Sequence, residues 1–401
     1  MRRPGGTAFP PGRPRFEFED GMKTLRFTRR EAGFLIGTGI LALLVRGTFF
    51  PFVSTDFRDF LSLWFDTLRQ NGGLGAIGLA VGDYSPPYIY LLALLTYLPL
   101  DGLHAVKLLS CAADLVLALY AMRIVWQVVG NKSYALLAWC GALFLPTVLI
   151  NSAVWAQCDA IYTAGLLACL YYFLREDSLR GMLAFSLALA FKLQAVFLAP
   201  LLLALLLKGR LRPLHLLLPP AVYLLGILPA ALMGRDFGEL LTIYLSQAGS
   251  YQELSMMAPN PYSWLNGMDS EIFAPAGILL LLGVTLIGCY FLVSSRVKLS
   301  ERAIVSLALL SVLLAPYLLP HMHERYFYAA DLLSLVYWFC YPRRWYVPLG
   351  VVGCSSYVVC NFVFSFDGGF LRVELLAVVL LVVIFLLLRD TVRELRGEAQ
   401  A

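Results

Sequence analysis

Residues 370–389, FLRVELLAVVLLVVIFLLLR, decide the class of fold. This run is apolar except for Arg372, Glu374 and Arg389, and it has the length of about 20 residues that a helix needs to cross a bilayer. Similar runs recur from residue 31 onward, and the 401-residue chain is 60% apolar and only 14% charged. Soluble domains are about 45–50% apolar and about 25% charged. Soluble enzymes, secreted disulfide scaffolds and disordered proteins are therefore excluded. Because the runs are continuous and Leu-rich, they predict an all-α polytopic membrane bundle and not a transmembrane barrel.

The apolar runs predict about twelve transmembrane helices. Two of them, 181–193 and 195–207, are too short to cross alone, so we expect half-length helices that meet within the membrane around Lys192. The first run has no small-x-small cleavage site, which favours a retained signal anchor. The ranges are 32–53, 104–126, 134–150, 158–174, 181–193, 195–207, 214–233, 272–294, 303–319, 326–341, 345–363 and 370–389.

Segment 86–99 (PPYIYLLALLTYLP) is ambiguous, and the placement of charge decides its interpretation. If it lies at the outer interface without crossing, 23 of the 31 Lys and Arg residues fall on the cytoplasmic side, as the positive-inside rule requires. Both termini are then cytoplasmic. The predicted organisation is a disordered basic tail (1–30), a transmembrane domain (31–389) with juxtamembrane helices in its first outer loop (54–103), and a short cytoplasmic tail (390–401).

Nearly all groups capable of chemistry then fall on the outer face. They lie in 54–103, 151–160, 234–271, 321–326 and 365–369. The short cytoplasmic loops offer little besides basic residues. Any reaction is therefore expected outside.

The first outer loop contains an amphipathic helix over 56–70, which we expect to lie flat on the outer leaflet. Asp56 stands where the first span ends and this helix begins. Two roles remain open for it: a cap of the helix N-terminus, or a general base that faces a cavity. Asp59, one turn on, is expected to share that task or to bind acceptor hydroxyls. The apolar face comprises Phe57, Phe60, Leu61, Trp64, Phe65 and Leu68.

Two further motifs carry polar groups on the outer side. In GDYSPPY (82–88), the prolines make a rigid turn in which Asp83 either caps the following helix or is held with Tyr84 over a pocket. In NSAVWAQCDA (151–160), the amide, indole and carboxylate groups suit a sugar, because hydroxyls take hydrogen bonds while an aromatic face stacks on the ring; a polar helix terminus is the alternative. The residues concerned are Asn151, Trp155, Gln157 and Asp159.

Two cations indicate a site for an anion. Lys192 lies deep in AFKLQAVFLAP (190–200) and needs a partner there, either a carboxylate such as Asp159 or a ligand phosphate. Arg325, in HMHERYFY (321–328), predicts a phosphate clamp with the neighbouring histidines. Metal binding is less favoured, since residues two apart on a helix do not share a face. The predicted phosphate-binding set is Lys192, Gln194, His321, His323 and Arg325.

Other features are assigned structural roles or exclude functions. Lys107 and Asp114, seven residues apart, are expected to pair on one helix face. The eight cysteines are scattered and form no CxxC motif, so we expect small buried hydrophobes. No phosphate-binding GxxxxGK[ST] motif is present, which leaves nucleotide-driven chemistry without a basis.

Taken in order, the motifs resemble those of the GT-C superfamily of integral membrane glycosyltransferases. The pattern is most similar to the bacterial relatives of the GPI-anchor second mannosyltransferase, and also to the ER glucosyltransferases that use dolichyl-phosphate-glucose. The resemblance implies a GT-C helical bundle and transfer of a hexose (mannose or similar) from a polyprenyl-phosphate donor, with inversion. It also implies that the loop carboxylate, Asp56, is the catalytic base. The chain departs from the family at WAQCD (155–159), where WGQ followed by a variable residue and Asp is expected.

Physical reasoning supports the same assignment. A lipid-phosphate donor needs cations at headgroup depth, and a phosphodiester leaving group can be stabilised by side chains without a metal. We therefore expect that the protein needs no cofactor or metal, and we expect no nucleic-acid partner. It binds the bilayer, the lipid donor, and a glycan or lipid-linked acceptor at the outer face of the cytoplasmic membrane. Acceptor and sugar contacts are predicted for Asp59, Asp83, Tyr84, Asn151, Trp155, Gln157 and Asp159.

Two other classes of function remain open. A transporter or lipid-carrier flippase also uses half-length helices and buried cations, although its polar lining is expected from both faces. A polysaccharide polymerase or ligase with a lipid-diphosphate donor ranks lower, because such enzymes usually need a large outer loop.

Overall fold

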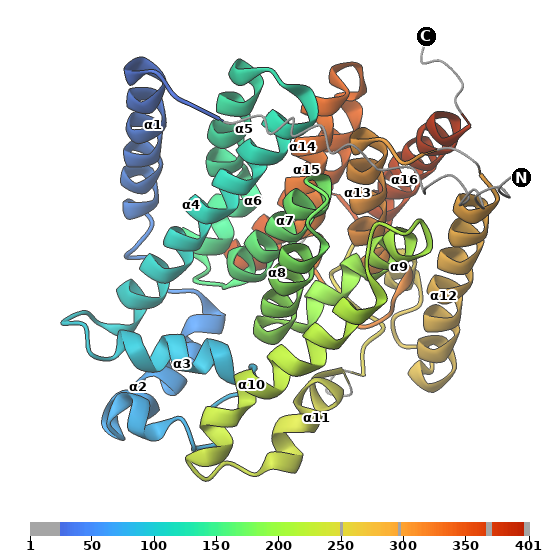
Figure 1. Cartoon of the computed structure of the whole chain (residues 1–401). Helices are drawn as coiled ribbons and strands as arrows, with labels where there is room; N and C mark the ends of the chain where they lie inside the picture. Colours follow the sequence, from blue (N-terminus) through green and yellow to red (C-terminus); the bar gives the residue numbers. More distant parts are fainter. Residues whose placement is uncertain (1–24, 249–251, 296–297, 366–370, 397–401) are drawn as a thin grey trace, which may run out of the picture.

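The computed structural model describes residues 25–248, 252–295, 298–365 and 371–396. Within these ranges the chain forms α-helices joined by short 3₁₀ and π turns, together with one pair of two-residue strands. Figure 1 shows the helices assembled into one bundle. The predicted all-α polytopic bundle is confirmed. Most of the predicted basic tail (1–24), most of SFDGG (366–369) and residues 397–401 lie outside the described ranges.

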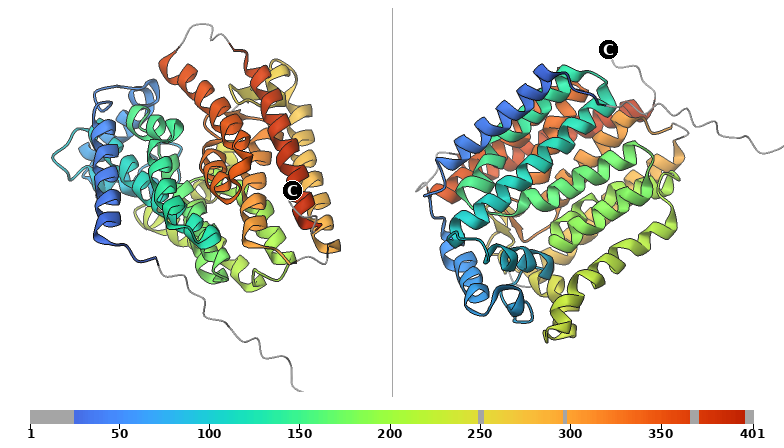
Figure 2. Two further views of the ribbon diagram at one scale, coloured as in Figure 1. Left: turned by 90° about the horizontal axis from the view of Figure 1, so that it is seen from above. Right: turned by 60° about the vertical axis from the view of Figure 1, so that its left-hand side comes forward.

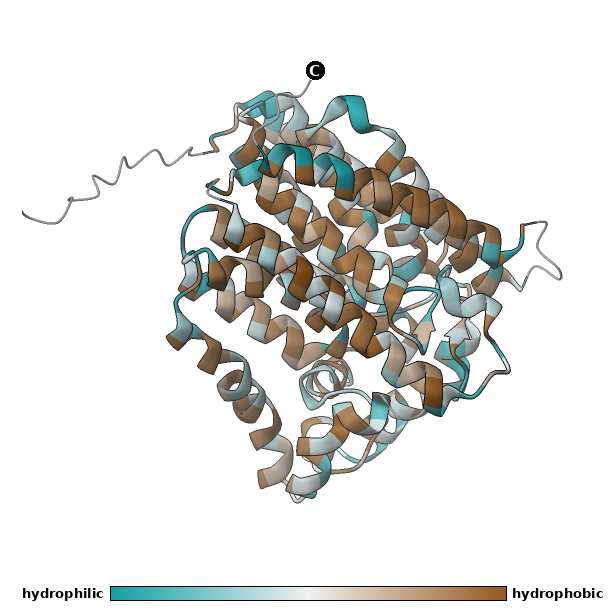
Figure 3. Ribbon diagram, turned by 90° about the vertical axis from the view of Figure 1, so that its right-hand side faces the viewer, coloured by the Kyte–Doolittle hydropathy of each residue, from teal (hydrophilic) through white to brown (hydrophobic). Residues whose placement is uncertain are grey.

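Six helices in the described part of the chain are long and apolar enough to cross a membrane. They are α4 (Gly102–Val129), Pro213–Leu232, which is η5 (Pro213–Leu217) plus α10 (Leu218–Leu232), α12 (Ser270–Ser294), α13 (Glu301–Leu318), Pro342–Phe364, which is η7 (Pro342–Arg344) plus α15 (Tyr346–Phe364), and α16 (Val373–Leu395). A seventh span arises if α5 (Lys132–Phe144) is counted together with Pro146–Val154 across a 47° bend. Figure 3 shows apolar residues over most of the helices of the bundle.

The remaining helices are shorter or flank the bundle. The shorter apolar ones are α3 (Pro86–Leu95), α7 (Asp159–Leu174), α8 (Ser178–Phe191), η4 (Leu193–Leu198) with α9 (Ala199–Leu207), and α14 (Tyr328–Cys340). The others are α1 (Arg29–Gly47), η1 (Phe57–Leu61), α2 (Ser62–Gln70), η2 (Gly73–Ala76), α6 (Pro146–Leu149), η3 (Ile150–Val154), α11 (Phe237–Ala248) and η6 (Pro261–Trp264). Every one of the twelve predicted ranges thus contains a helix, while the number that cross a bilayer stays a prediction.

The interhelical loops gather at two chemically different ends. α2, α3 and α11 lie together at one end of the bundle. This end is at the bottom of Figure 1 and of the right-hand view in Figure 2. The other end collects the basic loops, where Lys132 at the start of α5 bonds Glu31 at the start of α1 (3.2 Å), and Arg210 after α9 bonds Glu176 after α7 (3.0 Å). The bundle therefore has a basic end and an opposite end that carries the first loop.

The helices pack through small residues and interhelical polar bonds, as membrane bundles do. A Cβ added to Gly165 of α7 would lie 2.8 Å from the Cβ of Ala188 in α8, so glycine is needed for this close approach. Between α1 and α4, Arg46 Nε donates to Asp114 Oδ2 over 2.9 Å. Ser152 adds a second hydrogen bond to the same oxygen over 2.6 Å. These bonds tie three chain segments together in the interior.

The predicted pair between Lys107 and Asp114 is wrong. Lys107 Nζ donates instead to the backbone carbonyls of Phe49, Phe50 and Phe52, over 2.9, 3.2 and 2.7 Å. The chain that follows the C-terminus of α1 has carbonyls with no helical partner, and an ammonium satisfies them. Asp114 forms its ion pair with Arg46 instead. Lys107 therefore anchors the start of the first loop.

The break predicted at Lys192 is confirmed, while the interfacial position of segment 86–99 stays a prediction. The helical path breaks at Lys192, which is extended (φ −154°, ψ 132°) between α8 and η4. α3 has only ten residues, which is too short to cross. Its buried side chains pack in one cluster with Phe65 and Leu68 of α2, so the segment braces the first loop.

Candidate active site

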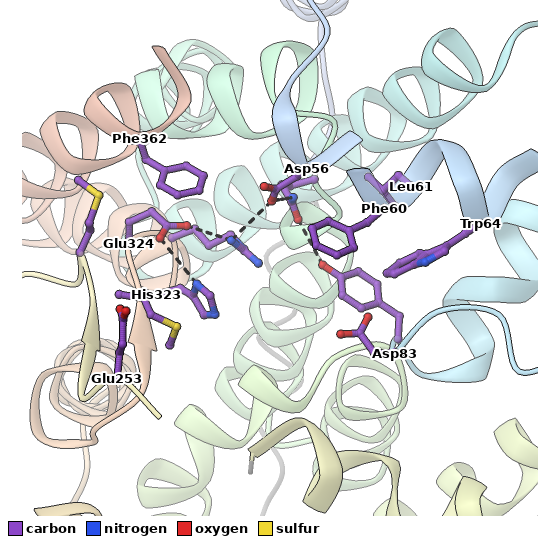
Figure 4. A pocket seen from close by; sticks show the side chains of 14 residues that line it. Asp56, Phe60, Leu61, Trp64, Asp83, Glu253, His323, Glu324 and Phe362 are labelled. Carbon is purple, nitrogen blue, oxygen red and sulfur yellow. Dashed lines mark hydrogen bonds and ion pairs between the residues drawn. The ribbon is translucent and has the colours of Figure 1, made fainter. Parts of the chain in front are cut away.

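Two adjoining cavities open at the end of the bundle that carries α2 and α3. The first has a volume of about 430 Å³ and the second about 410 Å³. Asp83, Tyr84 and Arg325 line both of them. The first is also lined by Asp56, Phe60, Leu61, Trp64, Gln157, Glu253, Met256, Met257, His323, Glu324 and Phe362. Figure 4 shows Asp56 and Asp83 reaching this cavity opposite Glu253, His323 and Glu324.

Asp56 is held at the wall of the first cavity by its neighbours. Ser54 Oγ donates to the Trp155 carbonyl (2.8 Å) and accepts from the Phe57 N–H (3.2 Å), so Ser54 and not Asp56 caps the first-loop helix. Of the two roles left open for Asp56, the helix cap is therefore wrong. Its carboxylate, 21% exposed, instead accepts a hydrogen bond of 2.8 Å from Gln157 Nε2. Arg325 lies 3.9 Å away on the same oxygen, Oδ2.

The GDYSPPY turn delivers Tyr84 between the two cavities. Gly82 adopts φ +67°, and a Cβ there would lie 2.6 Å from the Trp64 ring, so only glycine fits this turn. Ser85 occupies the position before α3, and its hydroxyl donates to the Ala190 carbonyl over 2.6 Å. Asp83 therefore does not cap α3, and that alternative is wrong. Its side chain lines the cavities instead.

A buried ion cluster forms the wall behind Tyr84. Lys192 pairs with Asp159, which is the first of the two alternatives predicted for this lysine, a carboxylate or a ligand phosphate. Asn151 Nδ2 donates to the other carboxylate oxygen of Asp159 over 2.8 Å, and Arg325 Nε lies 3.9 Å from that oxygen. The ammonium of Lys192 also lies 5.5 Å from the centre of the Tyr84 ring. Pairing and hydrogen bonding make these buried charges tolerable.

The HMHERY segment places a second cation at the junction of the cavities. Its strand β2 (Met322–His323) pairs in parallel with β1 (Ser255–Met256). Arg325 donates to the buried Glu324 over 2.9 Å. Burial lowers the pKa of His323, which favours a neutral imidazole. Burial alone would raise the pKa of Glu324, but the hydrogen bond from His323 and the charge of Arg325 outweigh it, so this pKa lies below its usual range.

The second cavity combines these cations with apolar walls. Lys192, Gln194, His321 and Arg325 reach it, and His321 Nδ1 is fixed at 2.8 Å from the Glu253 carbonyl. The rest of the lining is mostly apolar and comes from the position before α3, from α8, η4, α11 and α12, and from residues 319–326. It comprises Ser85, Phe191, Leu193, Val196, Phe197, Tyr244, Gln247, Ala274, Ile278, Leu319, Pro320, Met322 and Tyr326.

Nine of the thirteen predicted site residues line a cavity, and four do not. Asp59 lies outside both, with its carboxylate 45% exposed and bonded to Arg58 over 2.9 Å. Asn151, Trp155 and Asp159 are buried behind the wall. The Trp155 ring is covered by Arg325 (5.1 Å) and Phe362 (5.2 Å), so it has no free face for a sugar. We correct the direct sugar contacts predicted for these four residues: three support the wall and Asp59 faces solvent.

Other cavity residues were missed by the sequence analysis. Trp64 was placed on the apolar face of the amphipathic helix, although it lines the first cavity. The glycine at position 82, just before the DYSPPY motif, is the signal that something large packs there. Glu253, Met256 and Phe362 lie in segments without a recognisable motif, so their sequence gave no indication of a site.

Comparisons with known proteins bear on the fold. No protein-family model and no curated protein matches the sequence. The structure is similar to the crystal structure of ArnT from Cupriavidus metallidurans bound to undecaprenyl phosphate, with a TM-score of 0.56. The similarity covers 91% of this chain and 74% of that chain at 13% sequence identity. The chain thus has the polytopic GT-C fold of ArnT.

Proposed function

We propose that this protein is an integral membrane glycosyltransferase. It moves a hexose, mannose or a similar sugar, from a polyprenyl-phosphate-linked donor to a hydroxyl of a glycan or lipid-linked acceptor. One observation carries the proposal: the two cavities meet at Arg325, with a carboxylate, Asp56, on one side and a buried ammonium, Lys192, on the other. The polyprenyl phosphate bound to ArnT, which shares the fold, is consistent with such a donor.

The second cavity suits the donor. A polyprenyl phosphate has an apolar chain and an anionic head, and this cavity offers apolar walls next to Lys192 and Arg325. Both cations are largely buried, so their attraction to a phosphate is screened less than at the surface. Gln194 and His321 supply further polar groups at the same place.

The first cavity suits the acceptor and the chemical step. The acceptor oxygen forms a bond to the anomeric carbon while the bond from that carbon to the phosphate oxygen breaks. The acceptor proton passes to Asp56, and polyprenyl phosphate leaves with the bonding electrons. A single displacement inverts the anomeric centre and needs only one base. Arg325, which faces both cavities, stabilises the charge that develops on the leaving phosphate.

The placement of charge supports an outward-facing site. The basic loops lie at the end of the bundle opposite the cavities, and basic loops remain in the cytoplasm. We therefore place the cavities at the outer face of the cytoplasmic membrane and the described chain ends inside.

Transfer by the purified protein in nanodiscs tests the proposal. Undecaprenyl-phosphate-mannose and undecaprenyl-phosphate-glucose serve as donors, and an envelope extract from cells lacking the gene supplies unmodified acceptor. Released undecaprenyl phosphate is measured. The Asp56→Asn variant should lose about 10³-fold in kcat. Asp59→Asn is the matched control, because this carboxylate lies on the same loop outside the cavities, and it should retain activity.

Two results would contradict the proposal. One is near-normal turnover by Asp56→Asn. The other is movement of labelled lipid across a vesicle bilayer without loss of its sugar, which would favour a lipid carrier.

A further inference from the structure

The side-chain amide of Gln157 has one chemically possible orientation. A carboxylate that acts as a base only accepts hydrogen bonds, so the amide must present its NH₂ group to Asp56, over 2.8 Å. Its carbonyl oxygen therefore points the other way, where it accepts from the Tyr84 hydroxyl over 3.3 Å. The three side chains form a directed chain from Tyr84 through Gln157 to Asp56.

This chain distinguishes the two oxygens of Asp56. Gln157 bonds Oδ2, and Arg325 lies 3.9 Å from that same oxygen. Among the described residues, no hydrogen bond reaches Oδ1. The carboxylate is thus held through one oxygen while the other is left for a substrate hydroxyl.

The backbone before Gln157 is shaped to aim its side chain. Ala156 is fully buried and adopts φ +64°, a left-handed conformation that residues with a Cβ rarely adopt. The Trp155 N–H bonds the Ile150 carbonyl (2.8 Å) and the Gln157 N–H bonds the Asn151 carbonyl (2.9 Å). Strained conformations of this kind persist where the surrounding structure fixes them, and they cluster at functional sites.

We propose that Gln157 is the positioning residue of this site, which holds Asp56 so that its Oδ1 faces the acceptor hydroxyl. Tyr84 acts through Gln157 by fixing which end of the amide meets Asp56. The inference rests on the proposed function of Asp56 as the base. It adds a residue that does not itself exchange a proton and whose loss affects the chemical step more than donor binding.

The test is kinetic and uses the nanodisc assay with undecaprenyl-phosphate-mannose and undecaprenyl-phosphate-glucose. Gln157→Met keeps the size of the side chain but cannot form either hydrogen bond. We expect its kcat to fall about 10- to 100-fold, because small misplacements of catalytic groups are costly. The KM for the donor should stay within about twofold, because Gln157 does not line the second cavity.

Two further variants separate positioning from folding. Gln157→Glu can still accept from Tyr84 but offers Asp56 no donor, so its kcat should fall at least as far as that of Gln157→Met. Tyr84→Phe should lose about threefold to tenfold alone and nothing more in the Gln157→Met background, because the hydroxyl acts through the amide. Gln127→Met is the matched control: Gln127 also donates to a carboxylate, Glu301, over 2.7 Å, but near the C-terminal end of α4. It should leave kcat unchanged.

The outcomes distinguish the two proposals. No transfer by the wild-type protein with either donor would overturn the proposed function. An active wild-type protein overturns the positioning role if Gln157→Met retains kcat, if its kcat and donor affinity fall together, or if Tyr84→Phe loses as much in the double variant as alone.

Discussion

Among the described residues, Arg46–Asp114 and Lys192–Asp159 are both buried ion pairs, but they differ in what can reach them. Arg46 and Asp114 are 1% and 0% exposed, and Arg46 also donates to the Leu143 carbonyl over 2.8 Å. Neither lines the first or the second cavity. Lys192 pairs with Asp159 in the same way, but Lys192 also lines the second cavity. In the sequence, both pairs appear only as charged residues within apolar segments, so the sequence does not distinguish them. Access to a cavity, and not burial or pairing, separates the structural pair from the candidate functional one.

The largest loss of stability is expected at the pair of Arg46 and Asp114, which lines neither cavity. Arg46→Met leaves Asp114 buried without its cation, which should cost about 3–5 kcal/mol and abolish folding. Size-exclusion chromatography and thermal unfolding in detergent measure the folded fraction. The double variant Arg46→Met/Asp114→Leu should recover folded protein, because no charge remains unpaired. A folded single variant with the wild-type melting temperature would show that the pair is not structural.

A smaller loss of stability but a large loss of activity is expected at the pair of Lys192 and Asp159, because Lys192 lines the second cavity. In Lys192→Met, Asp159 keeps Asn151 and has Arg325 nearby, so the protein should still fold. Donor turnover should fall about 10²-fold or more, because a buried cation near the phosphate is lost. Lys208→Met, at the basic end, is the control for removal of a lysine and should keep its turnover. Wild-type turnover by Lys192→Met would place this pair with Arg46 and Asp114.

The ion pair between Glu324 and Arg325, next to Asp159, predicts that the stability of the protein depends on pH. The pKa of Glu324 is lowered from its usual 4.5, so the ionised form stabilises the folded protein. This contribution is fully present above about pH 4.5 and is lost as pH falls through the lowered value. Glu324→Gln should be less stable than the wild type by about 1–3 kcal/mol at pH 7. Melting temperatures measured from pH 7 downward should converge, and a constant difference would contradict the assignment.

The smallest effect is expected at Ala156. Glycine relieves the left-handed backbone strain but increases the entropy of the unfolded chain, and the two terms nearly cancel. Ala156→Gly should therefore change the free energy of unfolding by less than about 1 kcal/mol. Kinetics provide a second check, because activity near the wild-type value is expected if Gln157 keeps its aim. A loss above tenfold would mean that the Cβ of Ala156 has a packing role.

Much of this comparison could be predicted from the sequence. Apolar runs placed the helices, and the two short runs predicted the break at Lys192. The depth of this lysine predicted an anionic partner, but left a carboxylate and a ligand phosphate as alternatives. Partner choice was less predictable, because Lys107 and Asp114 share a helix face yet bond to chain segments far away. The two tryptophans were mispredicted for a similar reason. Trp155 was expected to contact the sugar but is buried, while Trp64 was expected only on an apolar helix face but lines the first cavity. A helical wheel places Trp64 on the apolar face of its helix, and only the folded chain shows it packed against the Gly82 turn at the wall of the first cavity.

A structure determined with undecaprenyl phosphate tests the central claim most directly, namely that the two cavities form one site that meets at Arg325. We predict that the phosphate lies in the second cavity, within about 4 Å of the Lys192 ammonium and the Arg325 guanidinium. The lipid chain should then run along the apolar walls from η4 and α12. A phosphate bound at the basic end, with both cavities empty, would contradict the account.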